Sequence, residues 1–507
     1  MRNFFSLLFS FFAFLSVYAY DVEIDGIYYN LIKKANYAEV TYKGKTYDEV
    51  KSYSGDIVIP DEITVEGQNY KVTSIVNMSF ENCPITSIKL GNNLRSTGNQ
   101  TFWNCKYLHE VDLGNSIEEI GTSAFNHCRN LTCISIPNSV KYIKGWCFSD
   151  CPNLRTVSIG NKVKTIEASA FYQTDNIETV IISDLSSWCK IKFADSPIRN
   201  NTRLFLKEKE LKELVIPKNV TEISENAFFR CASIEKLIIP NNVNKINKMA
   251  FRDCVNLKKV EFSNTITELP VGIFMGCSSL EEINLGENIK IINQCAFSEC
   301  DLRKIHIYGP VTTLYSSTFC YNEKLSSVIL PKTINKIDAY CFENCKDLER
   351  FYCYAITPPS VGYETFNNDY LEAVTLYVPL SSIKQYKSVS PWNEFGTIKA
   401  IEGIEDIAKP VEEIIDAIGN VEYTDVCKQK IDLARSGYDA LTKEQQDFVT
   451  NYSTLLNAEM AYKNLEKITG IVNIETNNNC TNRKFFVNGK IVIIKNGKKY
   501  NIYGQCE

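Results

Sequence analysis

The sequence predicts a β-rich solenoid followed by a small all-α helical bundle and a short β tail. One observation is a phenylalanine that returns every 22 to 24 residues, with one exception, as at Phe80, Phe102 and Phe125, until Phe366. Another is the pattern LxxIxIPxxVxxIxxxAFxxC around each of these residues. Near residue 411 the pattern changes to helical periodicity. A fixed period of this length predicts stacked repeats rather than independent globular domains.

One coil of about 22–24 residues is illustrated by residues 131–151. Ile134 and Ile136 alternate as in a short strand with one buried face, and Pro137 ends that strand because proline cannot donate a ladder hydrogen bond. A second extended piece follows. The AFxxC segment then predicts a single helical turn with Phe148 and Cys151 on its inner side. A lone coil cannot bury its apolar residues, so the coils must stack, with their short strands parallel.

Residues 1–19 have the pattern of a signal peptide, with one positive residue, an apolar run and Ala19 preceded by Val17. A buried or membrane-spanning helix is the alternative, but the run is short and no stop-transfer sequence follows. No other stretch approaches 18 apolar residues, so no transmembrane segment is expected after signal removal. The alternating residues 20–66 predict an N-terminal β cap that covers the apolar end of the first coil.

The solenoid is predicted over residues 67–370, with an insertion at about 183–212. The anchor phenylalanines on either side of the insertion are 57 residues apart. One interpretation is a tolerated structural variant. The other is a bulge that shapes a binding surface, because insertions in solenoids map to one face and loops often carry recognition. The candidate insertion contacts are Trp188, Phe193 and Arg199.

Three segments are predicted after the last anchor. Residues 371–403 predict a C-terminal cap in which Tyr386, Trp392 and Phe395 fold over the last coil. Residues 411–468 predict three or four helices, because Thr424 and Thr442 have the pattern of helix N-caps. Residues 483–507 predict a tail of two β-hairpins with Asn-Gly turns.

The repeats resemble the BspA-like subgroup of bacterial leucine-rich repeats, on segments such as NLTCISIPNSVKYIKGWCFSDC and SLEEINLGENIKIINQCAFSEC. The fold class is then a leucine-rich-repeat solenoid. The SSWCKIKF insertion and the N-terminal cap also have counterparts in that family. The helical segment resembles a module appended to bacterial surface proteins. The NGKKYNIYG ending is similar to the C-terminal domains of proteins exported by type IX secretion, which implies a sorting or anchoring signal, with a plain terminal β cap as the alternative.

The charge and the placement of the cysteines argue against nucleic-acid binding, a disulfide framework and a metal site. The net charge is −5 and the basic residues are dispersed, which argues against nucleic-acid binding. Nineteen cysteines in an exported chain would suggest disulfides, but nine of them lie three residues after an anchor phenylalanine, and Thr174 and Asn322 occupy the same position elsewhere. We therefore predict a buried ladder of free thiols that act as small apolar residues. No CxxC pair and no clustered histidine occurs, so neither a metal nor a cofactor is expected.

The sequence carries no catalytic constellation, so the chain is not expected to be an enzyme. GxSxG, GxxxxGK and HExxH are absent, and Glu281 and Glu282 are adjacent along a predicted strand and point to opposite faces. The three histidines are scattered, which leaves no base beside a nucleophile.

A partner-binding face is expected on the outward positions of the repeated strand, which vary while the apolar frame stays fixed. Its candidate residues are Arg155, Ser158, Lys236, Lys259, Glu261, Glu282, Asn284, Lys304, His306 and Tyr352. An extended face of mixed charge suits a long protein or glycan. The resemblance implies an adhesin of the cell surface that binds matrix or plasma proteins. The alternative is a structural or carbohydrate-binding scaffold of the envelope; in either case a monomer is expected.

Overall fold

The computed structural model describes residues 20–44, 53–366, 368–401 and 405–473 and the strands of 482–500. These residues form two compact units. The first runs to Val374 and includes Gln385–Thr397, and the second comprises Thr375–Lys384 and the chain from Ile398 onward. The signal peptide predicted for residues 1–19 lies outside the described residues.

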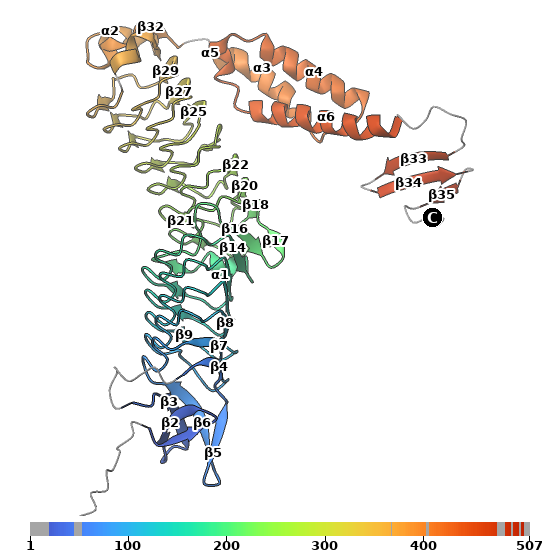
Figure 1. The fold of residues 1–507 in the computed structure, drawn as a ribbon. Coiled ribbons are helices and arrows are strands. Elements are labelled where there is room, and N and C mark those ends of the chain that lie inside the picture. Colours follow the sequence, from blue (N-terminus) through green and yellow to red (C-terminus); the bar gives the residue numbers. More distant parts are fainter. Residues whose placement is uncertain are drawn as a thin grey trace, which may run out of the picture. The chain divides into compact units, whose positions relative to one another are not determined.

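The first unit begins with a mixed sheet at the end of the solenoid (Figure 1). Its strands, in sheet order, are β1 (Val22–Ile24), β2 (Ile27–Ile32), β3 (Tyr37–Thr41), β6 (Gln68–Ile75) and β5 (Glu62–Val65). The solenoid itself starts earlier than expected, since β4 (Gly55–Val58) lies within the range predicted for the cap but pairs in parallel with β7 (Ile85–Lys89). The buried Tyr53 ring stacks on Phe80 at 4.3 Å, so it extends the anchor ladder by one coil.

The fold class is confirmed as a β-solenoid of about 13 turns with short parallel strands. Its first strand ladder follows the LxxIxI segments and is divided into four sheets. The strands are β4, β7 and β8 (Glu110–Asp112); β10 (Cys133–Ile136), β12 (Thr156–Ile159), β14 (Thr179–Ile182) and β16 (Arg203–Leu206); β18 (Glu213–Val215), β20 (Lys236–Ile238) and β22 (Lys259–Glu261); and β25 (Lys304–His306), β27 (Ser327–Leu330) and β29 (Arg350–Cys353). The short strand β17 (Lys209–Glu210) pairs antiparallel with β16 at the edge of its sheet.

A second parallel ladder follows the VxxI segments. Its strands are β9 (Glu119–Ile120), β11 (Tyr142–Ile143), β13 (Thr165–Ile166) and β15 (Lys192–Phe193); β19 (Glu222–Ile223) and β21 (Lys245–Ile246); and β23 (Glu268–Leu269), β24 (Ile291–Ile292), β26 (Thr313–Leu314), β28 (Lys336–Ile337) and β30 (Ser360–Val361). The inward residues of both ladders are buried, and the anchor rings stack between them, as Phe125 does on Phe148 at 5.5 Å. Stacking therefore buries what a single coil could not.

The AFxxC segment is not the predicted helical turn. Trp146 (φ 61°) and Asp150 (φ 51°) flank the anchor Phe148 in the left-handed region, which a right-handed helix excludes. The amide of Phe148 donates to the carbonyl of Ala170 in the next coil at 2.8 Å. The amide of Asp150 donates to Tyr172 at 2.9 Å. The segment is a series of tight turns that forms a third ladder between coils. A spacing of three residues fits either conformation, so the pattern alone could not separate them.

The cysteine ladder is buried and free, as predicted. Its thiols also do more than fill space. Cys128 donates to the carbonyl of Phe102 at 3.2 Å, and the same contact recurs in most other regular coils. Thr174 takes the place of the cysteine in one coil, and its hydroxyl donates to the carbonyl of Phe148 at 2.7 Å. We call this position, three residues after the anchor, the donor slot. The donor slot therefore requires a small side chain that also donates a hydrogen bond, so the prediction that these thiols act only as small apolar residues was incomplete.

The last coil of the first unit is covered by aromatic residues. Trp392 and Phe395 pack against Phe351, with ring centroids 6.0 and 5.8 Å away. The indole of Trp392 donates to the carbonyl of Pro359 at 2.9 Å, and the hydroxyl of Tyr386 donates to the carbonyl of Ala355 at 2.8 Å. Tyr386 is the last residue of α2 (Ile383–Tyr386), Trp392 is the first of η4 (Trp392–Glu394), and Phe395 follows η4 directly. This part of the chain also forms η2 (Asn368–Ala373) and η3 (Leu380–Ser382).

The second unit contains β31 (Thr375–Val378), β32 (Thr397–Ala400) and four helices. The helices are α3 (Glu405–Asp416), α4 (Asp425–Asp439), α5 (Lys443–Gln446) and α6 (Tyr452–Asn473). Thr424 caps α4 and Thr442 forms a capping box with Gln445, as the sequence predicts. An ion pair links α4 to α6, because Arg435 Nε lies 2.7 Å from Glu459. α3 starts six residues before the range predicted for the bundle.

The tail consists of three antiparallel strands, β33 (Asn482–Val487), β34 (Lys490–Lys495) and β35 (Lys498–Tyr500). This is the strand order of the two predicted hairpins. The turn residues 488–489 and 496–497 and the chain after Tyr500 lie outside the described residues.

Candidate functional site

The outward residues of the first strand ladder form the candidate binding face. Ser158 of β12 is half-buried and lies in register between Ser135 and Ile181. Arg155 precedes that strand, and its Nε lies 3.4 Å from the carboxylate of Glu178 in the next coil. The strand pairing therefore places these side chains in rows that cross the coils.

Lys236, Lys259 and Glu261 form a charge network on β20 and β22. The Lys236 ammonium lies 3.0 Å from Glu213 and 3.3 Å from Glu261. Lys259 is also 3.3 Å from Glu261. The hydrogen bond to Glu213 raises the pKa of Lys236. Because these charges neutralise one another, this part of the face has no strong net charge to attract an ionic partner.

Glu282 and Asn284 occupy an irregular segment, and the sheet is interrupted between β22 and β25. Burial raises the pKa of the half-buried Glu282, against the opposing effect of Lys304. Asn284 is exposed and accepts a hydrogen bond from the amide of Gly286 at 3.0 Å. The backbone at this level therefore does not continue the hydrogen-bonded strand ladder.

Lys304 and His306 point outward from β25. The His306 ring stacks on Tyr308 with centroids 3.7 Å apart. Burial, and after it Lys304, lowers the pKa of His306 to about 3, so the imidazole is neutral at physiological pH. His306 therefore contributes a flat uncharged ring to the face.

The prediction that Tyr352 is exposed is wrong. Its side chain is fully buried in β29, and so is the adjacent outward residue Ile329 of β27. Both strands have their last three residues buried, so both faces of the sheet are covered at this level. The sequence carried a signal of this, because apolar side chains replace polar ones at the outward positions of these two strands.

The candidate insertion contacts are also buried rather than presented to a partner. Trp188 lies in α1 (Leu185–Trp188), and its ring packs against Phe193 at 4.9 Å. The Trp188 indole donates to the carbonyl of Ala227 in the next coil at 2.8 Å. The bulge interpretation is wrong for these two residues because their rings fill the inside of an irregular coil.

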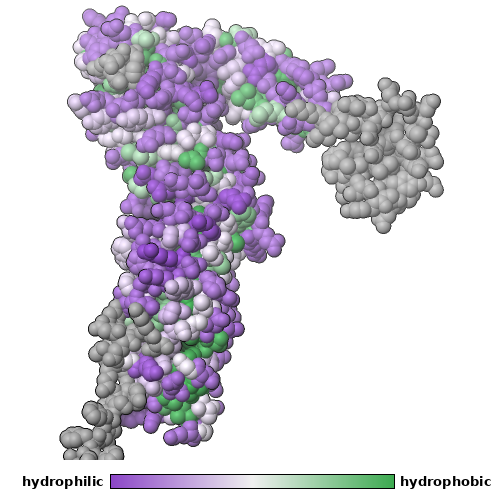
Figure 2. Space-filling model, in the orientation of Figure 1, coloured by the Kyte–Doolittle hydropathy of each residue, from purple (hydrophilic) through white to green (hydrophobic). Residues whose placement is uncertain are grey.

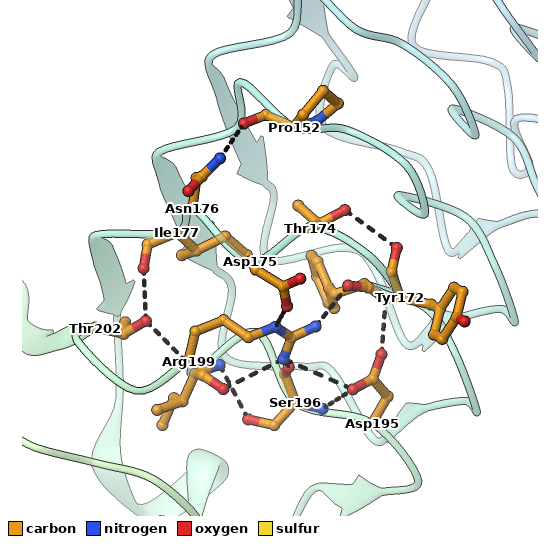
Figure 3. Close-up of polar contacts among 12 residues, drawn as sticks. Pro152, Tyr172, Thr174, Asp175, Asn176, Ile177, Asp195, Ser196, Arg199 and Thr202 are labelled. Atoms are coloured by element: carbon orange, nitrogen blue, oxygen red, sulfur yellow. Dashed lines mark hydrogen bonds and ion pairs between the residues drawn. The ribbon is translucent and has the colours of Figure 1, made fainter.

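Arg199 is held among polar groups of its own coil and the preceding one (Figure 3). Its Nη2 donates to the carbonyl of Phe171 at 2.5 Å, and its Nε lies 3.6 Å from Asp175. Asp195 accepts a hydrogen bond from the amide of Phe171 at 2.8 Å. Only 13% of the Arg199 side chain is exposed, so it satisfies backbone groups and offers little surface to a partner.

A strip of apolar outward residues was not singled out by the sequence analysis. Ile181 of β14 pairs with Phe205 of β16, and Val215 of β18 pairs with Ile238 of β20. Val215 is 49% exposed, and the other three are half-buried. The two pairs lie in separate sheets, with β17 paired to the other edge of β16, and we call the four residues together the apolar strip. Its signal was apolar residues at outward positions in VIIS, LFLK, LVIP and LIIP, where most other coils have polar ones.

The strip lies on a surface that is mostly hydrophilic. In Figure 2 hydrophobic residues of the first unit gather in small patches among polar ones. Charged residues border the strip, with Arg203 over the Phe205 ring at 5.5 Å and the pair of Glu213 and Lys236 beside Val215 and Ile238.

The described residues also form a cavity outside the apolar strip. This cavity of about 370 Å³ lies between coils near Cys300, but its lysines are paired with its acids, as Lys324 is with Asp301 at 2.5 Å. In the part of the chain that the structure describes, no group of His, Cys, Asp and Glu side chains could hold a metal ion. None of the described helices has both the length and the apolar character needed to cross a bilayer.

Comparison with known proteins relates the solenoid to one family. The model of the BspA type leucine rich repeat region matches residues 73–199, 198–325 and 312–408, which is more than half of the chain. A leucine-rich repeat protein from Bacteroides ovatus is 24% identical, and the match covers 76% of this chain and 100% of that one with a TM-score of 0.44. A comparison with curated proteins finds no match.

Two further crystal structures resemble the chain. A leucine-rich cell surface protein from Faecalibacterium prausnitzii is 24% identical, over 65% of this chain and 93% of that one, with a TM-score of 0.33. The pneumococcal vaccine antigen PcpA is 18% identical, over 75% of this chain and 98% of that one, with a TM-score of 0.46. Proteins with BspA-type repeats are commonly surface proteins that bind other proteins, and they are typically non-enzymatic scaffolds.

Proposed function

Because the chain belongs to the BspA-type leucine-rich repeat family, we propose that it is an exported surface protein whose solenoid binds an extracellular protein. The partner is of the matrix or plasma type and contacts the outward face of the first strand ladder. The family supports protein binding, and the choice of face rests on the apolar strip.

The apolar strip is the observation that carries the proposal. Protein interfaces have an apolar centre inside a polar rim, and the centre supplies most of the affinity. Ile181, Phe205, Val215 and Ile238 provide such a centre. The neighbouring polar residues, from Arg155 and Ser158 on one side to Lys259, Glu261 and Asn284 on the other, form the rim. Since the charges of this rim neutralise one another, they would select among partners more than they would drive binding.

The proposed location is the cell surface. The family is typically found there, and the segment 1–19 has the pattern of an export signal. The β tail would act as the sorting or anchoring signal. Protease treatment of intact cells should cleave the solenoid, whereas a chain protected until the envelope is opened would contradict surface exposure.

Binding can be tested with the full mature chain on immobilised matrix and plasma glycoproteins, with fibronectin and fibrinogen among them. We expect saturable binding to at least one of them in surface plasmon resonance. The double variant Val215→Asp, Ile238→Asp should weaken that binding on the order of tenfold or more, because it places charges at the centre of the interface.

The matched control is Thr165→Asp, which adds a charge to an outward position of β13 in the second ladder. It should leave both the affinity and the melting temperature unchanged. No binding to any protein of the panel, or equal binding by the double variant and the wild type, would overturn the proposal.

A further inference from the structure

The turn face of the solenoid, formed by the third ladder, carries aromatic side chains that the core does not use. Trp146 is 44% exposed and Tyr172 in the next coil is 48% exposed. Their ring centroids are 5.3 Å apart at an interplanar angle of 66°. Similar edge-on pairs occur on this face between Trp103 and His127 and, far along the stack, between Tyr340 and Tyr363.

The backbone gives no reason for a ring at residue 146. Trp146 has a φ of 61°, a left-handed conformation that bulky residues rarely adopt. The same left-handed φ recurs two residues before the anchor in the other coils, at small residues such as Ser123 and Gly272 and at large ones such as Met78, Met249 and Tyr340. The backbone conformation therefore belongs to the repeat, and since the indole is exposed, the core does not account for it either.

The segment that carries Trp146 is held in a fixed position. The Glu167 carboxylate accepts a hydrogen bond from the amide of Gly145 at 3.2 Å and lies 3.0 Å from Lys144. The amide of Asp150 donates to the carbonyl of Tyr172, which ties the two coils together. The two rings therefore emerge from a backbone that is already ordered, which lowers the entropic cost of binding.

The charges around the pair are already matched. Lys144 lies between Glu167 and Glu119, at 3.0 and 3.7 Å. A polyanion would find no unpaired cluster of cations here, and a broad apolar protein surface would find only isolated rings separated by polar groups. A neutral glycan fits better, because its C–H faces pack on aromatic rings while its hydroxyls bond to carboxylates and amides.

We propose that Trp146 and Tyr172 form a stacking subsite for a neutral polysaccharide, on a face distinct from the apolar strip. The recurrence of aromatic pairs along the turn face suits a ligand that is itself a chain of repeated rings. Because this site does not use the strand face, its function is independent of the protein partner proposed above.

The test is affinity electrophoresis of the full mature chain in native gels that contain yeast mannan, a soluble β-glucan or starch. We expect at least one of these neutral polysaccharides to retard the wild type. The double variant Trp146→Ala, Tyr172→Ala should be retarded less, with an apparent affinity lower by roughly tenfold. Tyr107→Ala, which removes an exposed ring outside the pair, should migrate as the wild type does.

Trp146→Gly separates recognition from folding. Glycine accepts the left-handed backbone more readily than tryptophan, so this variant should lose retardation while its melting temperature does not fall. No retardation of the wild type by any neutral polysaccharide would overturn the subsite. So would unchanged retardation of the double variant, or loss of protein capture rather than glycan binding in that variant. Val215→Asp, Ile238→Asp should retain glycan binding, which keeps the failure of one proposal distinct from that of the other.

Discussion

The regular coils and the irregular coil of residues 183–212 close the same solenoid by different means. In a regular coil, backbone amides and one small donor side chain complete the third ladder, as Cys151 does on the carbonyl of Phe125. In the irregular coil the side chains of three larger or charged residues replace those groups. Asp195 accepts from the Phe171 amide, Arg199 donates to the Phe171 carbonyl, and Trp188 donates to Ala227.

This difference shows that a break in the repeat is a structural event before it is a functional one. The residues that depart most from the pattern point inward and satisfy backbone groups that the neighbouring coils would otherwise leave buried and unpaired. The candidate binding residues of the same region lie on the outside, where Ile181 and Phe205 keep the strand register and change only their polarity.

The largest expected effect is a loss of stability of the regular coils at high pH. Burial raises the pKa of the ladder thiols, such as Cys128 and Cys277, well above its usual range. The unfolded thiols ionise above a pH of roughly 8.5 while the folded ones stay protonated, so stability falls as pH rises through this window. Each thiol contributes about 1.4 kcal/mol per pH unit.

Urea unfolding at pH 7.5 and 9.5 checks this. The urea midpoint should be lower at pH 9.5 than at pH 7.5, by an amount that corresponds to several kcal/mol in the free energy of unfolding. Between pH 6.5 and 7.5 the thiols stay protonated in both states, so they should hardly change the midpoint. An equal midpoint at pH 7.5 and 9.5 would show that the ladder is not the row of buried thiols described above.

Phe251→Ala tests the ring ladder of the regular coils. The side chain is fully buried and stacks on Phe228 at 5.4 Å, so its removal leaves a cavity. We expect a loss of about 3–5 kcal/mol in the free energy of unfolding. The exposed Tyr107→Ala should change it by less than about 0.5 kcal/mol. Similar losses in the two variants would contradict the assignment of Phe251 to the core.

Arg199→Met tests the irregular coil. The methionine retains much of the volume but leaves the Phe171 carbonyl without its donor, which should cost about 1–3 kcal/mol in chemical denaturation. Arg203→Met removes a charge from the exposed side of β16 and should be nearly neutral. If Arg199→Met were also neutral but weakened partner binding, Arg199 would be a contact residue after all.

Cys128→Val and Cys128→Thr form a matched pair in the donor slot of a regular coil. Threonine and valine are similar in shape, and only threonine can donate to the Phe102 carbonyl. Threonine already fills this slot at residue 174, so Cys128→Thr should be close to the wild type. The valine variant should be less stable than the threonine variant by about 1 kcal/mol. Equal stabilities would mean that the slot selects size alone.

The periodic apolar residues were sufficient to predict the solenoid, because burial of one face per strand fixes their spacing. The caps of α4 and α5 and the strands of the tail also followed from local sequence. The turn conformation and the exposure of Tyr352 did not. The AFxxC spacing fits two backbone conformations, and the exposure of an outward residue depends on what covers it. The apolar strip required knowing that Ile181 lies in register with Phe205, and Val215 with Ile238.

Side-chain footprinting of the chain in complex with its protein partner tests the central claim most directly. Hydroxyl radicals should label Phe205, Val215 and Ile238 less in the complex than in the free chain, while the labelling of Trp146 and Tyr172 stays unchanged. Protection confined to the strip and its charged border is the predicted result. Unchanged labelling of the strip, with protection on the turn face or the helices instead, would contradict the assignment of the partner to the strand face.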